Sequence, residues 1–213
     1  MAGHVITIAQ QKGGAGKTTL AAHLAVAWAG AGRRVALIDI DPQASLAGWH
    51  HLREERLGAG RSGLAFLAIT GWRVAAEVER RARDHDLVIL DSPPHAETEA
   101  RIAVRASQLV LVPVQPSPMD LWATQPTLDL ARQEKVPVLL VLNRVPPRAN
   151  LTEAMAARIG ELGARLAAAR IGNRVALAAA MTEGRGITEA AEGGRAAEEV
   201  EALAREVAGV IGL

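Results

Sequence analysis

The stretch that decides the fold is QKGGAGKTTL, residues 11–20. An apolar run at 5–9 precedes it and a helix-compatible run at 20–28 follows it, which is the strand–loop–helix context of a phosphate-binding loop. The chain holds 24 Lys plus Arg, yet its only lysines are Lys12, Lys17 and Lys135, and two of them lie in this loop. A compact ammonium fits a phosphate cradle in a way that a planar guanidinium does not. The stretch therefore predicts a nucleotide-phosphate site.

Short apolar runs alternate with longer Ala-rich amphipathic runs along the rest of the chain. Several of the short runs are apolar throughout, as in strands covered on both faces of a parallel sheet. The alternation predicts an α/β fold, a doubly wound and mostly parallel sheet with helices on both faces, in a single domain spanning 1–213. The expected strands are Val5–Ala9, Val35–Asp39, Leu87–Asp91, Leu109–Val114 and Val138–Asn143, with weaker ones at Ala65–Ile69 and Val175–Ala178. The expected helices are Lys17–Ala29, Trp72–Asp84, Glu97–Ala106, Leu121–Gln133, Leu151–Ala169 and Ala196–Ile211.

Composition excludes several classes of protein. The chain has no cysteine, so it has neither disulfides nor thiolate metal sites. We expect neither a signal peptide nor a membrane span, and therefore a cytoplasmic protein. Net charge is only +1, but residues 144–185 carry seven arginines against three glutamates, whereas 186–213 carry two arginines against six glutamates. This asymmetry predicts either a basic interaction surface or two solvated helix faces of opposite sign.

The glycine-rich loop has a direct chemical interpretation. Its glycines allow successive backbone N–H groups to point inward at a helix N-terminus, which creates an anion nest. Lys17 would bridge the β- and γ-phosphates, and the Thr18 hydroxyl would ligate Mg²⁺. The expected phosphate-binding residues are Gly13, Gly14, Ala15, Gly16, Lys17, Thr18 and Thr19.

The loop departs from the common phosphate-loop pattern, because Gln11 stands where that pattern has its first glycine. KGGAGKTT at 12–19 resembles the deviant Walker A motif of the ParA/MinD family of ATPases. DIDPQ at 39–43 and LVILDSPP at 87–94 resemble the second signature and the Walker B strand of that family. PVQPSP at 113–118, with DLW at 120–122, resembles its small ParF-type members. Four ordered motifs over nearly the whole chain imply a P-loop NTPase architecture.

The acidic motifs follow strands and suit metal and water chemistry. Pro42 ends a strand and turns the chain, so Asp41 can reach toward the phosphates. Asp91 ends an apolar strand, where it can hold Mg²⁺ through water. The resemblance implies that Asp41 positions or activates the attacking water. It also implies that Asp39 helps to orient Thr18 and the water shell of the metal.

Two further residues concern the nucleotide and the partner. The resemblance implies that Lys12 crosses a dimer interface to the phosphates bound by a second copy. Asn143 closes an apolar strand where P-loop proteins read the base. Guanine recognition needs a carboxylate three residues later, but that position is Pro146, so ATP is expected. The predicted cofactors are ATP and Mg²⁺.

Several branches of the family fit poorly. Cysteine-dependent members and tyrosine-tailed kinases are excluded by composition, and the acidic last helix does not suit a membrane anchor. The small single-domain type remains. It implies an ATP-state homodimer, non-specific binding of duplex DNA, association with the nucleoid and a ParB- or ParG-like partner. The candidate DNA contacts are Arg148, Arg158, Arg165, Arg170, Arg174, Arg185 and Arg195, each of which can equally be an ordinary surface residue.

Two other functions stay open at this point, a P-loop amide ligase or synthetase and a nucleotide-gated scaffold with negligible hydrolysis. Trp28 and Trp72 are expected in the core, and Trp122 either in the core or at a dimer interface. Pro126 is expected to mark the first turn of its helix.

Overall fold

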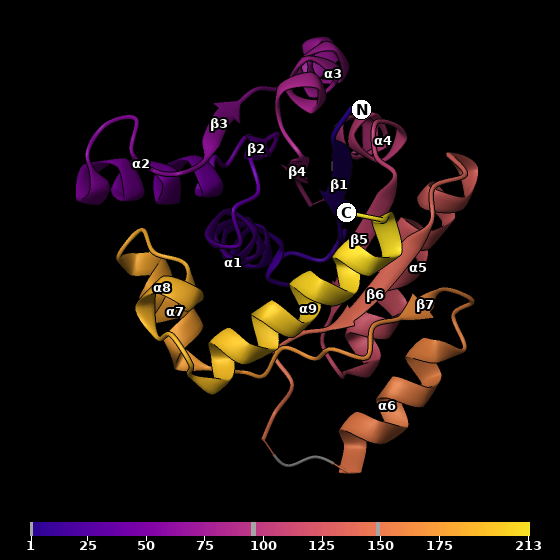
Figure 1. The fold of residues 1–213 in the computed structure, drawn as a ribbon. Helices are drawn as coiled ribbons and strands as arrows, with labels where there is room; N and C mark the ends of the chain where they lie inside the picture. The colour runs from indigo at the N-terminus through magenta and orange to yellow at the C-terminus, as the bar shows by residue number, and fades with distance from the viewer. Residues whose placement is uncertain (1, 95–96, 148–149) are drawn as a thin grey trace.

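A seven-stranded parallel sheet with helices on both faces forms the centre of the computed structural model, which describes residues 2–94, 97–147 and 150–213 (Figure 1). The strand order is β3-β2-β4-β1-β5-β6-β7, and every pairing between these strands is parallel. The strands are β1 His4–Ile8, β2 Val35–Asp39, β3 Ala65–Ala68, β4 Leu87–Asp91, β5 Leu109–Val114, β6 Val138–Leu142 and β7 Arg165–Leu166. The doubly wound α/β fold expected from the sequence is confirmed.

The helices divide between the two faces of the sheet. One face is covered by α1 (Lys17–Gly30), α2 (Ser45–Leu57), α7 (Val175–Thr182), α8 (Ile187–Ala190) and α9 (Arg195–Ile211). The other is covered by α3 (Val74–Asp84), α4 (Glu97–Arg105), α5 (Pro118–Gln133) and α6 (Asn150–Gly160), with a short 3₁₀ turn, η1 (Gly71–Arg73), ahead of α3. The central strands bury side chains on both faces, which explains why their sequences are apolar rather than alternating.

Strand register brings the functional motifs to one edge of the sheet. β1 lies between β4 and β5, and β2 lies on the far side of β4. Asp91 at the end of β4 is paired in register with Ile8 of β1 and with Asp39 of β2. Because all of these strands are parallel, the loop after β1 and the acidic residues after β2 and β4 emerge side by side.

The expected strand at Val175–Ala178 is wrong, because this segment lies in helix α7. Its sequence VALAAAMT is rich in alanine, the residue with the highest helix propensity. A four-residue apolar run does not separate strand from helix by its periodicity.

The expected long helix at Leu151–Ala169 is also wrong in extent, because α6 ends at Gly160 and β7 follows at Arg165–Leu166. Gly163 has a φ of +75°, a left-handed conformation that glycine adopts without steric cost. The sequence patterns do not predict β7, α2 and α8. These elements are short or carry weak apolar patterns, and their positions depend on contacts with distant parts of the chain.

Helix α5 begins earlier than expected. Ser117 is its N-cap, with a side-chain oxygen that accepts from the Asp120 backbone N–H at 3.2 Å, and Pro118 occupies the first turn. Pro126 therefore lies inside the helix and does not mark its first turn. The core position expected for Trp72 is wrong, because this side chain is 85% exposed. Trp28 is buried as expected, whereas Trp122 is 67% exposed, which excludes the core for it.

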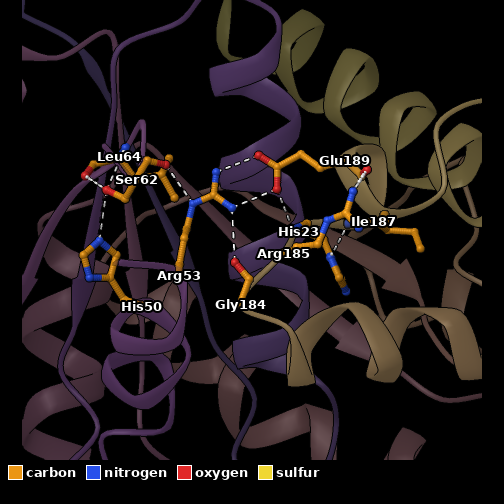
Figure 2. A network of polar contacts seen from close by, with 10 residues as sticks. His23, His50, Arg53, Ser62, Leu64, Gly184, Arg185, Ile187 and Glu189 are labelled. Atoms are coloured by element: carbon orange, nitrogen blue, oxygen red, sulfur yellow. Dashed lines mark hydrogen bonds and ion pairs between the residues drawn. The ribbon is translucent and has the colours of Figure 1, made fainter. Parts of the chain in front are cut away.

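A buried arginine links α2 to α8 and to the loop before α8, in the same layer of helices. Arg53 donates through Nε to the Ser62 carbonyl at 2.7 Å and through Nη1 to the Gly184 carbonyl at 3.2 Å. Both terminal nitrogens donate to the Glu189 carboxylate, at 2.8 and 2.7 Å. Figure 2 shows the guanidinium between these partners, and we call this group, Arg53, Ser62, Gly184 and Glu189, the Arg53 clamp. The clamp holds the helix that follows the Asp41 turn.

The loop before α8 is packed against two helices. A Cβ at Gly184 would lie 2.4 Å from the Arg53 backbone nitrogen, and a Cβ at Gly186 would lie 2.4 Å from the Val26 side chain. His23 of α1 completes the contact, because its Nδ1 accepts from the Ile187 backbone N–H at 3.0 Å. Glycine at 184 and 186 is therefore required by close packing between α1 and α2.

Candidate functional site

The glycine-rich loop joins β1 to α1 in the conformation that an anion nest needs. Gly14 and Gly16 have φ values of +74° and +92°, and Gly16 is the residue that caps α1. Lys17 begins the helix and is 7% exposed. Burial lowers the pKa of Lys17 below its usual value, while the carboxylates of Asp91 and Asp41 act in the opposite direction. A buried ammonium at a helix N-terminus is a strong site for an anion.

Thr18 and Asp91 form the second part of the site. The Thr18 hydroxyl donates to Asp91 Oδ2 at 2.6 Å. Asp91 is 1% exposed, and burial raises its pKa to about 7, although the hydrogen bond from Thr18 acts to lower it. Its other oxygen, Oδ1, is buried and has no hydrogen-bond partner among the described residues. Such an oxygen suits a water molecule of a hydrated cation.

Asp39 and Asp41 have different surroundings. Asp39 is buried, and its two carboxylate oxygens accept from the backbone N–H groups of Asp41 and Ala47, both at 3.0 Å. Burial raises the pKa of Asp39, and these two amides act against that rise. Asp41 is partly exposed and accepts from the Gln43 backbone N–H at 2.9 Å. In this geometry Asp39 fixes the turn that carries Asp41, and Thr18 donates to Asp91. The involvement of Asp39 in a metal site stays a prediction.

Most of the predicted phosphate residues and Asp41 line one cleft, whereas Ala15, Asp39 and Asp91 are not part of its lining. It has a volume of about 440 Å³ and lies at the carboxyl ends of the strands. Its lining includes Lys17, Thr18 and Asp41, together with Ala178 and Met181 of α7. No three acidic or histidine side chains in the described parts of the chain converge on a ready-made metal cage. A site with few carboxylates is what Mg²⁺ bound together with phosphates requires.

Asn143 contacts the phosphate loop directly. Its Nδ2 donates to the Ala15 carbonyl at 2.8 Å, and its Oδ1 accepts from the Arg144 backbone N–H at 3.0 Å. A Cβ at Gly16 would lie 2.5 Å from this Nδ2, so the close approach requires glycine. A neighbouring hollow of about 280 Å³ is lined by Asn143 and by 172–175. The side-chain amide of Asn143 thus holds the phosphate loop in position. Its contact with the base of a nucleotide stays a prediction.

Lys12 does not point into the cleft of its own chain. Its Nζ lies 2.5 Å from Oδ2 of Asp120 in the first turn of α5. The sequence analysis named Asp120 only as part of a motif. A cap residue followed three positions later by an acid predicts the start of a helix. Ser117 and Asp120 have this spacing.

Most of the candidate DNA-contacting arginines are already close to carboxylates. Arg158 is exposed on α6, and Arg148 lies outside the described residues. Carboxylates of the same chain lie within the ion-pair limit of the remaining five, which are Arg165, Arg170, Arg174, Arg185 and Arg195. The glutamates concerned include Glu199 and Glu206 of the acidic helix α9. The basic and acidic segments of the sequence therefore partly neutralise each other in the fold.

A known family model matches most of this chain. The description of that model is "CobQ/CobB/MinD/ParA nucleotide binding domain", and it matches residues 6–187. The chain belongs to this family. It is thus a ParA/MinD-type ATPase, and the resemblance noted in its sequence is confirmed.

Relatives and solved structures agree with this assignment. The chain is 30% identical over 209 residues to maintenance of carboxysome distribution protein A from Halothiobacillus neapolitanus, covering 95% of each chain. It is 37% identical over 134 residues to the chromosome-partitioning ATPase Soj from Thermus thermophilus, covering 52% of this chain and 54% of Soj. The ATP complex of a variant of Cyanothece McdA has a TM-score of 0.82 at 17% identity, covering 100% of this chain and 97% of that one. At that identity the structure supports the fold.

No helix in the described part of this ATPase is long and apolar enough to cross a bilayer.

Proposed function

We propose that this ATPase hydrolyses Mg²⁺-ATP as a dimer and positions DNA or another intracellular cargo. The observation that carries the proposal is the convergence of Lys17, Thr18 and Asp41 at one cleft of about 440 Å³, with Asp91 hydrogen-bonded to Thr18. The relative matched over 95% of both chains acts, by its name, in carboxysome distribution, and Soj in chromosome partitioning. Both names describe positioning of a large cargo.

Each residue of the cleft then has a task. The loop amides and the Lys17 ammonium bind the phosphates, and they compensate the charge that builds up during phosphoryl transfer. The carboxylate of Asp41 orients the attacking water. Asp39 holds the Asp41 turn in place through its two backbone contacts. Asn143 holds the phosphate loop in position through its hydrogen bond to the Ala15 carbonyl.

Mg²⁺ fits the residues beside Lys17. The Thr18 hydroxyl oxygen would ligate the ion, and the unpartnered Asp91 Oδ1 would accept a hydrogen bond from its water shell. When bound, the ion supplies positive charge to the phosphate oxygens. Burial raises the pKa of Asp91, and a bound cation would oppose that rise by stabilising the carboxylate.

The dimer is proposed to bind duplex DNA non-specifically in the ATP state and to respond to a ParB- or ParG-like partner. Phosphate contacts require only positive charge. Here the candidate arginines already face glutamates, so DNA phosphates must compete with those carboxylates. We expect weak binding by one copy and tighter binding by a dimer that presents the basic surface twice.

ATP turnover and DNA binding test the proposal together. Lys17→Ala should abolish nucleotide binding, and Asp41→Ala should bind ATP, dimerise and turn over at least a hundredfold more slowly. DNA retention should require ATP rather than ADP and should weaken steeply with salt. DNA binding that is independent of nucleotide would contradict the DNA part, and unchanged turnover in Asp41→Ala would contradict the role of that residue.

The alternatives make different predictions in the same assay. A P-loop amide ligase would consume ATP only when a carboxylic acid and an amine are added. A nucleotide-gated scaffold would bind ATP and change its oligomeric state without turnover, with DNA and adaptor present.

A further inference from the structure

A groove of about 690 Å³ runs between α3 and α4, on the face of the sheet opposite α1 (Figure 1). It reaches the amino ends of the strands, because Gly3, just before β1, and Gln108, just before β5, line it. The nucleotide cleft lies at the carboxyl ends, and the two linings share no residue among those the structure describes. The α3–α4 groove is therefore a second hollow, separate from the nucleotide cleft.

The floor of this groove is apolar and firmly held. Val5, Val78 and Ala82 are buried there as part of the hydrophobic core between the sheet and the two helices. The Gly3 backbone N–H donates to the Ala82 carbonyl at 2.5 Å, which ties the start of the first strand to α3. None of the polar side chains that line the described part of the groove is buried. Small-molecule sites usually hold a few precisely placed polar groups, so this groove suits a partner that fills it with apolar side chains.

An exposed tryptophan lies at one end of the groove. Trp72 is part of the lining and is 85% exposed, and the neighbouring Ala75 of α3 is exposed as well. Covering an indole ring removes a large apolar area from water. Tryptophan is also among the residues that contribute most to binding energy at protein interfaces. The exposed ring therefore favours contact with another protein chain.

The rim of the groove carries more positive than negative charge. Its lining contains three arginines, Arg83, Arg101 and Arg105, against one acid, Glu79. Glu134 accepts from Arg101 and from Arg105, each at 2.8 Å, so it holds two guanidinium groups beside the groove. Arg83 is exposed at the end of α3. A basic rim around an apolar floor is complementary to a partner that places acidic side chains beside apolar ones.

We propose that the α3–α4 groove binds an amphipathic helix of a partner protein, with apolar residues on one face and acidic residues beside them. Its apolar side chains, spaced as i, i+3, i+4 and i+7, lie on the floor and against Trp72. Its carboxylates face the three arginines of the rim. DNA phosphates would use the arginines but not the apolar floor. The inference goes beyond the proposed function, because it requires neither hydrolysis nor DNA and allows a protein and a nucleotide to be bound together.

A displayed library of helical peptides of about 16 residues, roughly four turns, provides the probe. Selection on the full chain should enrich sequences with apolar residues at the helical spacing and Asp or Glu beside them. An enriched peptide with a fluorescent label then gives a dissociation constant by anisotropy. That constant should be the same with ATP, with ADP and without nucleotide, because the groove and the cleft have no lining residue in common.

Two substitutions on one helix form a matched pair. Ala75→Glu places a carboxylate in the groove, whereas Ala76→Glu places it at the next, equally exposed position outside the lining. Ala75→Glu should weaken peptide binding at least tenfold, and Ala76→Glu should leave it unchanged. Unchanged ATP turnover in both variants shows that they fold. Arg83→Glu is a second variant: it should weaken the acidic peptide and should bind more tightly a peptide whose acids are replaced by lysine.

The outcomes separate this inference from its rivals and from the proposed function. A selection that enriches no peptide or only peptides without acidic residues overturns the inference, and so does equal binding to Ala75→Glu and Ala76→Glu. It also fails if duplex DNA or phosphatidylglycerol vesicles, rather than a peptide, lose binding in Ala75→Glu alone. Absence of ATP turnover in the unchanged chain contradicts the proposed function and leaves peptide binding in the groove unaffected.

Discussion

The Arg53 clamp and the Lys12–Asp120 pair both join a cation to a carboxylate from a distant part of the chain, but they bury opposite partners. In the clamp the arginine side chain is 4% exposed and the Glu189 side chain 38% exposed. In the pair the Asp120 side chain is 2% exposed and the Lys12 side chain 35% exposed. The buried member is the arginine in the clamp and the carboxylate in the pair, so the clamp encloses its cation and the pair leaves its cation partly open to solvent.

The chemistry of the two cations widens this difference. Arg53 presents a planar fork whose nitrogens meet a carboxylate and two carbonyls, and it lies over the Trp49 ring at 5.7 Å. Burial alone would raise the pKa of Glu189, but hydrogen bonds from Arg53 and the Gly186 amide lower it below its usual value. Lys12 presents a single point charge on a flexible stem. A rigid contact with several partners suits a structural role, whereas a single contact on a flexible stem holds its side chain less firmly.

Removing the clamp should have the largest effect on stability. Arg53→Met keeps much of the apolar stem but leaves the Ser62 and Gly184 carbonyls without their donor, so we expect a loss of about 4 kcal/mol in the free energy of unfolding. Urea titration measures it. Arg56→Met is the control, because Arg56 lies one turn later on α2, is 47% exposed and faces Glu183 at 3.6 Å. It should cost less than about 0.5 kcal/mol, and equal losses would show that the clamp has no special role.

The histidine beside the clamp should make stability depend on pH. The Leu177 carbonyl can only accept, so the 3.2 Å contact places the proton on Nε2 of His23 and leaves Nδ1 to accept from Ile187. Burial lowers the pKa of His23 to about 4. As the pH falls, His23 of the unfolded chain binds a proton before His23 of the folded chain does. The free energy of unfolding is therefore unaffected by His23 above pH 6.5 and falls by about 3 kcal/mol toward pH 4.

The difference in stability between His23→Gln and the unchanged chain isolates this effect, because all other titrating groups are common to both. His51→Gln, at an exposed position on α2, should keep the full slope. A slope retained in His23→Gln would mean that another group causes it.

Overpacking the clamp should have a smaller effect. Gly184→Ala places a methyl group 2.4 Å from the Arg53 backbone nitrogen at a φ of +64°, whereas Gly193→Ala, at a φ of +68°, meets nothing within 4 Å. Both variants should lose about 1 kcal/mol in the free energy of unfolding, because alanine is strained in the left-handed backbone conformation. Gly184→Ala should lose about 2 kcal/mol more through its clash. Thermal or urea unfolding of the two variants measures the difference. Similar losses would show that the loop moves away from α2 easily.

The smallest effect on stability is expected at the Lys12–Asp120 pair. Asp120→Asn should change the free energy of unfolding by less than about 1 kcal/mol, because the amide keeps the shape and removes a buried charge. Urea titration of Asp120→Asn and of Arg53→Met provides the comparison. A loss as large as that of Arg53→Met would make the pair a permanent structural contact like the clamp.

Local patterns in the sequence located most of the fold. Uniformly apolar runs marked β2, β4 and β5 at their observed bounds, because a strand buried on both faces needs no information from elsewhere in the chain. Ala-rich segments were harder. Val175–Ala178 and the end of the run at 151–169 were misassigned, since short apolar runs satisfy either period until their packing partners are known.

The sequence by itself determined the phosphate loop, because its glycines, Lys17 and Thr18 act within a few residues of one another. It also indicated that Asp41 lies where one strand ends and that Asp91 ends another. Only the tertiary structure decided that Asn143 supports the loop, that Arg53 holds α2 and that Lys12 meets Asp120, 108 positions away. Contacts between distant positions depend on how helices pack on the sheet, and no local spacing encodes that packing.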